Sequence, residues 1–158
     1  MGGDSMIFDD QFLDFNIIRK KLAELPRILE PYKKYISAVL LFGSLAIENE
    51  TPLSDVDLAI LYNHSLKGSE LDQLHSQIWG ITTDLLESQD IDFINLNCAP
   101  LSMQYGAIKQ AKILVLNNRE AYIDFWEQSV KYYLDFKPLL DECNEELLNT
   151  LTGRAING

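Results

Sequence analysis

Three aspartates in the sequence offer the kind of ligands that hard metal ions prefer. Asp55 and Asp57 stand at the start of an apolar run, and Asp92 stands at the start of a later one. Alternate residues of a strand share a face, so Asp55 and Asp57 are predicted to lie side by side. Two carboxylates this close repel each other and raise a pKa unless a cation lies between them. Mg²⁺, which prefers oxygen ligands, is the expected cation.

Asp92 completes a cluster of three carboxylates if its strand pairs beside the strand of Asp57. Three carboxylates can hold two metal ions about 3.5–4 Å apart, which stabilise the attacking and leaving oxygens in phosphoryl or nucleotidyl transfer. Metal ions would also offset the charge of a nucleotide triphosphate. The alternative for each aspartate is a solvated strand end, and it applies most to Asp92.

Gly43 and Ser44 directly follow another apolar run. A tight turn from a strand into a helix would expose backbone N–H groups and a hydroxyl there, the donors that phosphates require. A Gly-Ser pair alone is a common turn. Its significance lies in its distance from Asp55, because ten residues, 45 to 54, separate Ser44 from that carboxylate.

The elements that would position these residues are indicated by the spacing of apolar side chains. Strands are predicted at 35–42, 55–62, 91–96 and, as a short edge strand, 113–116. Helices are predicted at about 9–25, with Asp9 or Asp10 as the cap, and at about 70–87 and 101–111. The remainder is helical, with one stripe through Tyr122, Trp126, Val130 and Tyr133 and a final segment after Pro138. This order predicts an α/β (α+β) domain, a small mixed β-sheet flanked by helices, with a C-terminal helical extension.

Length and charge narrow the classes of function. The 158 residues suit one domain, expected at 9–158, with 1–8 as a disordered tail or cloning remnant and Met6 as an alternative start. The 13 Lys and Arg against 24 Asp and Glu leave a net charge of −11, which argues against direct nucleic-acid binding and suits a basic protein partner. Acidity that serves only solubility is the alternative. The sequence has no apolar run long enough for a membrane span and no basic, apolar leader, so a cytoplasmic protein is expected.

The spacing of the motif resembles the signature of the DNA polymerase β-like nucleotidyltransferase superfamily. Gly43-Ser44, ten residues and Asp55-Val56-Asp57 form that pattern, and the resemblance covers a catalytic core of about 36–97. The segment from Tyr122 to Phe136, within C-terminal helices expected at about 119–150, resembles the carboxy-terminal helix of MntA-type antitoxins. Those minimal nucleotidyltransferases work with a HEPN-domain ribonuclease toxin encoded beside them.

The resemblance implies a fold and a reaction. The fold is that of a polymerase β-like nucleotidyltransferase, in which Gly43 and Ser44 would hold the nucleotide phosphates. Asp55 and Asp57 would bind Mg²⁺, and Asp92 would aid the metal and activate the attacking hydroxyl. In the antitoxin branch, AMP passes from ATP to a toxin tyrosine with release of pyrophosphate. The implied partner is a HEPN-type ribonuclease in a hetero-oligomer.

One departure from the family pattern bears on nucleotide binding. Many relatives carry Arg-Gly shortly after Gly-Ser-x-Ala, whereas this chain has Ile47-Glu48, followed by Glu50. Losing an arginine removes a bidentate phosphate ligand, and added carboxylates work against a triphosphate. Two alternatives therefore stay open: a catalytically weak antitoxin that acts by steric binding, and a small-molecule nucleotidyltransferase.

Overall fold

A four-stranded mixed sheet forms the centre of the protein. The computed structural model describes the backbone of residues 12–156 and the side chains of residues 12–153. The strands β1 (Ile36–Phe42), β2 (Val56–Tyr62), β3 (Ile91–Asn95) and β4 (Lys112–Leu116) lie in the order β3-β2-β1-β4. β1 pairs antiparallel with β2 and β4, and β2 pairs parallel with β3. The predicted mixed sheet and the position of the last strand at an edge are confirmed.

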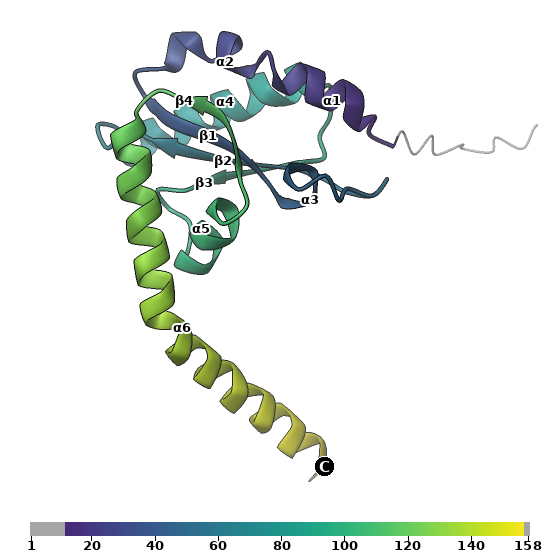
Figure 1. Ribbon diagram of the computed structural model, residues 1–158, viewed down its shortest axis with the longest axis vertical. Coiled ribbons are helices and arrows are strands. Elements are labelled where there is room, and N and C mark those ends of the chain that lie inside the picture. Colours follow the sequence, from purple (N-terminus) through teal and green to yellow (C-terminus); the bar gives the residue numbers. More distant parts are fainter. Residues whose placement is uncertain (1–11, 157–158) are drawn as a thin grey trace, which may run out of the picture.

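Helices cover the two faces of the sheet (Figure 1). One face packs against α1 (Phe15–Leu22), α2 (Leu25–Ile28) and α4 (Ser69–Leu86). On the other face, Ala38, Leu40, Ala59 and Leu61 pack with side chains of α5 (Leu101–Ile108) and of the first half of α6 (Arg119–Ile156). The short α3 (Gly43–Ala46) follows β1 directly, as the Gly-Ser turn predicts.

The first predicted helix is wrong in its limits. α1 begins at Phe15, where the Asp14 carboxylate caps it by accepting from the backbone N–H groups of Asn16 and Ile17 at 3.0 and 3.3 Å. It ends at Leu22, and Pro26 lies in the separate short helix α2. The predicted caps Asp9 and Asp10, and the predicted tail 1–8, lie outside the described residues.

The last helix differs more from the prediction. Pro138 does not begin a new segment, because α6 runs through it as one helix of 38 residues. Proline lacks the N–H that would bond one turn back, so it bends a helix more easily than it ends one that is stabilised elsewhere. α6 changes direction partway along and extends beyond the sheet (Figure 1). No helix among residues 12–156 is long and apolar enough to cross a membrane.

Candidate active site

Asp57 and Asp92 lie side by side where β2 and β3 begin, and Asp55 comes just before β2. We call this end of the sheet the carboxylate edge. Asp57 of β2 lies directly opposite Asp92 of β3 in the parallel register, so their side chains project from neighbouring strands on one face. Asp55 immediately precedes β2. The backbone N–H of Val56 donates to the carbonyl of Asp90 at 3.0 Å, which holds the starts of the two strands together. The strand of Asp92 therefore pairs beside that of Asp57, as the sequence analysis required, while the three-carboxylate metal cluster stays a prediction.

These carboxylates face the side of the sheet that carries α5. Val56 and Leu58 pack on the α1 and α4 side with Ile18, so Asp57 between them points the opposite way. Ala59, two residues further on, is buried on the α5 side. Asp57 is half-buried there, while Asp55 and Asp92 are exposed. One ionisable group thus sits inside the edge of the domain and two lie at its rim.

Gly43 is pressed against Asp57. Its backbone has φ +68°, and a Cβ added to it would lie 2.0 Å from the Asp57 Oδ2 atom. Phe42 of β1 pairs with Asp57 of β2, which explains why the turn after β1 meets the carboxylate. The glycine is required here for two reasons, a left-handed conformation and the absence of a side chain. Ser44 follows it in α3, and its carbonyl accepts the N–H of Asn49 at 2.9 Å.

The electrostatics of the site disfavour a bare carboxylate at Asp57. Its burial raises the pKa of Asp57 above the usual value of 3.8, and the negative charges of Asp92 and Asp55 raise it further. The ionised form of Asp57 therefore destabilises the folded chain unless a cation compensates its charge. A half-buried carboxylate with two acidic neighbours has the charge pattern expected of a cation site.

The carboxylate edge offers the type of donor that Mg²⁺ prefers, but its described residues are not an assembled set of ligands. All three groups are carboxylates, and hard divalent ions prefer such oxygen ligands over thiolates and imidazoles. Within residues 12–153, no three His, Cys, Asp or Glu side chains are arranged so that they could hold a metal ion. What the structure provides is a half-buried carboxylate with two acidic neighbours, beside a glycine turn that admits no side chain.

The acidic loop between the glycine turn and Asp55 is neutralised by two basic residues that the sequence analysis did not single out. Glu48 forms an ion pair with Lys112 of β4, with 3.1 Å between its Oε1 and the lysine Nζ. Glu50 forms an ion pair with Arg19 of α1. A hydrogen bond from its own backbone N–H and the Arg19 guanidinium lower the pKa of Glu50. The partners lie far apart in the sequence, so no local pattern could have revealed them.

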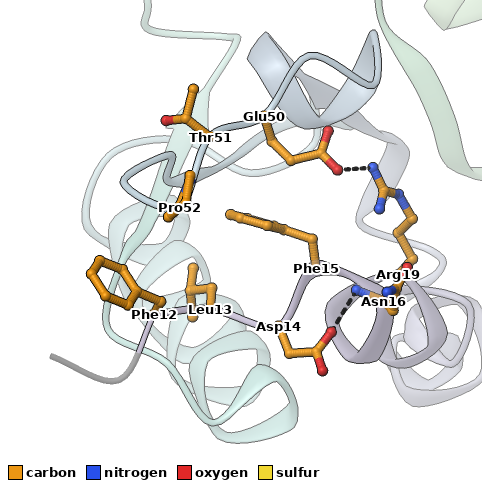
Figure 2. Close-up of a pocket in the computed structure, with 9 residues that line it drawn as sticks. All are labelled: Phe12, Leu13, Asp14, Phe15, Asn16, Arg19, Glu50, Thr51 and Pro52. Carbon is orange, nitrogen blue, oxygen red and sulfur yellow. Dashed lines mark hydrogen bonds and ion pairs between the residues drawn. The ribbon is translucent and has the colours of Figure 1, made fainter. Parts of the chain in front are cut away.

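A pocket of about 560 Å³ lies between the segment Glu50–Pro52 of this loop and the start of α1. Figure 2 shows Arg19 reaching across to Glu50 at one side of the pocket, while the Phe15 side chain extends toward Pro52. The residues that line the pocket are Phe12, Leu13, Asp14, Phe15, Asn16, Arg19, Glu50, Thr51 and Pro52. It includes none of the three aspartates. The pocket therefore belongs to the support of the loop and is separate from the carboxylate edge.

Removal of the Arg19 side chain is expected to impair the site without unfolding the protein. In Arg19→Ala, Glu50 loses the ion pair that ties its loop to α1, so the loop that leads to Asp55 is held less firmly. Glu50 is not one of the proposed ligands, so we expect Mg²⁺ affinity to fall by less than the about 10- to 100-fold that follows loss of a group bonded directly to a metal ligand. The measurement is Mg²⁺ affinity by isothermal titration calorimetry.

A matched control is available in the same helix. Lys21→Ala breaks the pair between Lys21 and Glu87, which joins α1 to the end of α4 away from the loop. This variant should bind Mg²⁺ as the parent does. The charge exchange Arg19→Glu with Glu50→Arg should recover part of the affinity. Equal affinities for Arg19→Ala and Lys21→Ala would contradict a positioning role for Arg19.

Comparison with known proteins places this site in a family. Residues 23–120 match the sequence profile described as "Polymerase beta, Nucleotidyltransferase". The matched residues make up more than half of the chain and include the glycine turn and all three aspartates. The chain belongs to the polymerase β nucleotidyltransferase family. A comparison of the sequence with curated proteins finds no match.

Several of the similar solved structures are toxin–antitoxin complexes. A chain of a toxin–antitoxin complex with AMP-PNP is 19% identical with a TM-score of 0.62, covering 86% of this chain and 99% of that one. A complex of a tri-AMPylated Shewanella oneidensis HEPN toxin with an MNT antitoxin gives 16% identity and a TM-score of 0.63, covering 82% and 98%. An MntA–HepT complex gives 16% and 0.61, with the same coverage. At these identities the likeness establishes the fold.

Proposed function

We propose that this chain is an antitoxin that neutralises a HEPN-type ribonuclease toxin by transferring AMP from ATP to a tyrosine of the toxin. The observation that carries the proposal is the packing of Gly43 against Asp57, with Asp92 opposite and Asp55 beside it. This juxtaposes a turn suited to phosphates with three carboxylates suited to Mg²⁺. Membership of the nucleotidyltransferase family supports the reaction type.

We propose the following roles for the residues of the carboxylate edge and the glycine turn. Asp55 and Asp57 would hold Mg²⁺, with Asp92 as the third ligand, and Gly43 and Ser44 would position the nucleotide phosphates. Bound Mg²⁺ would supply positive charge to the phosphate oxygens during transfer. Asp92, which is exposed at the rim, would accept the proton of an incoming tyrosine hydroxyl. The hydroxyl oxygen bonds to the α-phosphorus, and pyrophosphate leaves as the bond to its bridging oxygen breaks.

The folded chain reduces the expected penalty that Ile47-Glu48, which departs from the family's Arg-Gly pattern, imposes on nucleotide binding. Glu48 and Glu50 each face a basic residue, so neither adds an uncompensated charge beside the triphosphate. The cost that remains is the missing arginine, which leaves phosphate binding to the backbone turn and the metal. This supports an active enzyme with modest nucleotide affinity.

A second function, neutralisation by binding alone, is favoured by a separate observation. The described side chains from Leu134 to Thr152 are all exposed on α6, and many of them are apolar. A helix with such a surface is typical of a protein that binds another protein. Binding and transfer are compatible, and only the test below decides whether binding suffices.

The purified chain should modify the ribonuclease encoded beside it. Incubation of the pair with ATP and Mg²⁺ is expected to add about 329 Da, the mass of one adenylyl group, to the toxin for each tyrosine modified, as measured by intact-protein mass spectrometry. Modification should stop the ribonuclease from cleaving RNA. EDTA should prevent both effects.

The controls distinguish the three candidate functions. If the wild-type pair binds Mg²⁺ and ATP but the toxin shows no change in mass, the proposed transfer is overturned and steric binding remains. Protection of cells by a variant with Asp55→Asn and Asp57→Asn would support binding alone. Adenylation of an aminoglycoside without any protein acceptor would favour the small-molecule enzyme.

A further inference from the structure

The C-terminal half of α6 extends away from the domain with an apolar stripe that no other described element covers. The first half of the helix is anchored, because Tyr133 stacks on Tyr105 of α5 with 3.9 Å between ring centroids and the Ser129 hydroxyl donates to Gln104 at 3.3 Å. After Tyr133 the described side chains up to Thr152 are exposed. The core therefore ends at Tyr133 and the helix continues.

The apolar stripe of the first half continues into the second. Side chains three and four residues apart share a helix face, and this spacing links Tyr133 to Phe136, Leu140, Leu147 and Leu151. Exposed fractions are 50% for Phe136, 42% for Leu140, 58% for Leu147 and 55% for Leu151. A contiguous stripe on a helix of this kind is the arrangement that docks into a groove of a partner. We call Phe136, Leu139, Leu140, Cys143, Leu147 and Leu151 the α6 stripe.

The length of this segment adds to the argument. Residues 134–153 span about 30 Å at 1.5 Å per residue. Most of the stability of helices in proteins comes from packing of an apolar face and not from helix propensity. Nothing in the described part of the chain provides that contact, so a partner is expected to stabilise it.

The charge of this segment indicates which kind of partner surface it can bind. Residues 134–153 carry five carboxylates and one lysine, a net charge of −4, and Asp135, Glu142 and Glu146 border the stripe on one side. A second copy of the chain would bring two such acidic segments together, and an acidic membrane surface would repel this one. A basic protein surface complements it. A ribonuclease carries such a surface, because it has to bind RNA phosphates.

We propose that the α6 stripe docks into a groove on a basic, RNA-binding face of the ribonuclease partner, and so holds that partner while the carboxylate edge acts on it. The inference rests on the proposed function for the identity of the partner. It goes beyond that function by assigning the contact surface to residues 136–151, outside the nucleotidyltransferase fold. Docking there also places the acidic border of the helix against the surface that RNA would occupy.

The test compares two sets of leucine substitutions in the full chain. Leu140→Glu with Leu147→Glu places charges in the stripe, whereas Leu134→Glu changes a leucine with 56% exposure that is two residues from Phe136 and so off the stripe. Leucine and glutamate have similar helix propensities, so the helix should persist in both variants. Circular dichroism verifies this.

The stripe variant is expected to bind the ribonuclease at least about 100-fold more weakly, since two apolar anchors at an interface centre each account for about tenfold or more. Leu134→Glu should bind as the parent does. Affinities come from isothermal titration calorimetry with the ribonuclease encoded beside the chain. Equal affinity of the parent and the stripe variant, or equal loss in both variants, would overturn the docking surface.

Two exposed cysteines provide an independent footprint on the unaltered protein. Cys143 lies on the stripe and Cys98 lies in the connection between β3 and α5. A thiol reagent should label both in the free chain, and the ribonuclease should protect Cys143 and leave Cys98 reactive. A Cys143 that stays fully reactive in the complex would contradict the proposal, as would a free chain that is a dimer until Leu140→Glu with Leu147→Glu dissociates it.

Failure of this inference can be told apart from failure of the proposed function. A ribonuclease that does not bind the parent chain at all overturns the partner itself. Normal binding without adenylation overturns only the transfer. Adenylation with an unimpaired stripe variant overturns only the docking surface.

Discussion

Replacement of Gly43 by alanine should abolish nucleotidyl transfer and destabilise the fold. The new Cβ would lie 2.0 Å from Asp57 Oδ2 and 2.9 Å from its Cγ, both far inside contact distance. Either the turn moves away from the phosphates or Asp57 leaves its place opposite Asp92. A shift of about 1 Å at a reacting centre costs on the order of 100-fold in rate. We expect at least that loss in the rate of toxin adenylation, measured by mass spectrometry.

The same substitution has a stability signature. Overpacking costs about 1–3 kcal/mol, and an alanine at φ +68° adds backbone strain to that. A protein of this size loses about 2–4 °C of melting temperature per kcal/mol. Thermal unfolding by calorimetry should therefore show Gly43→Ala clearly below the parent.

Gly80→Ala is the matched control. Gly80 lies within α4, and a Cβ there would meet no atom within 4 Å. Alanine is favoured over glycine inside a helix by about 0.5–1 kcal/mol, so this variant should be slightly more stable and fully active. Full activity of Gly43→Ala would show that the turn does not position the reacting groups.

Replacement of Asp57 by asparagine is expected to remove activity and, in the absence of metal, to stabilise the fold. Asparagine keeps the shape of the side chain but cannot provide the negative charge that a metal ion needs. Loss of several kcal/mol of charge stabilisation in the transition state corresponds to roughly 1000-fold in rate. Adenylation by Asp57→Asn should fall by that order.

The stability change follows from the direction of the pKa shift. Burial, Asp92 and Asp55 raise the pKa of Asp57 above 3.8 in the folded chain, so the ionised carboxylate destabilises the fold at neutral pH. The contribution of this group to stability is greatest below pH 3.8 and is lost as the pH rises through the folded-state pKa. In EDTA at pH 7, Asp57→Asn should therefore melt at a higher temperature than the parent. The difference should shrink as the pH falls toward 3.8.

In the presence of Mg²⁺, the parent should melt at a higher temperature than Asp57→Asn. Binding to the folded state stabilises the parent by mass action, and Asp57→Asn should gain little from the same addition. Asp84→Asn, at an exposed position on α4, serves as the control and should follow the parent in both conditions. A parent that melts above Asp57→Asn in EDTA at pH 7, or an Asp57→Asn variant that Mg²⁺ stabilises as much as the parent, would contradict a cation site at Asp57.

The strands and the facing of the aspartates were predictable because they depend on local periodicity. Alternation along β2 puts Val56 and Leu58 in the core and Asp57 on the opposite face, whatever the rest of the chain does. The continuous apolar runs likewise indicated buried strands, and the long helix α4 matched its predicted range within one residue at each end. The spacing between Ser44 and Asp55 identified the motif, and the match of residues 23–120 to the family profile agrees with it.

Contacts between distant parts of the chain were decided only by the tertiary structure. The pairings of Arg19 with Glu50 and of Lys112 with Glu48 depend on how α1 and β4 come to lie beside the loop, and no local pattern encodes that. The same holds for the limits of α1, which Asp14 caps, and for α6, which continues through Pro138. The sequence by itself determined the strands, the family and the three carboxylates, because side-chain periodicity and spacing are local. The tertiary structure alone decided that Gly43 abuts Asp57 and that α6 leaves the domain with its stripe exposed, because both depend on where elements far apart in sequence meet or fail to meet.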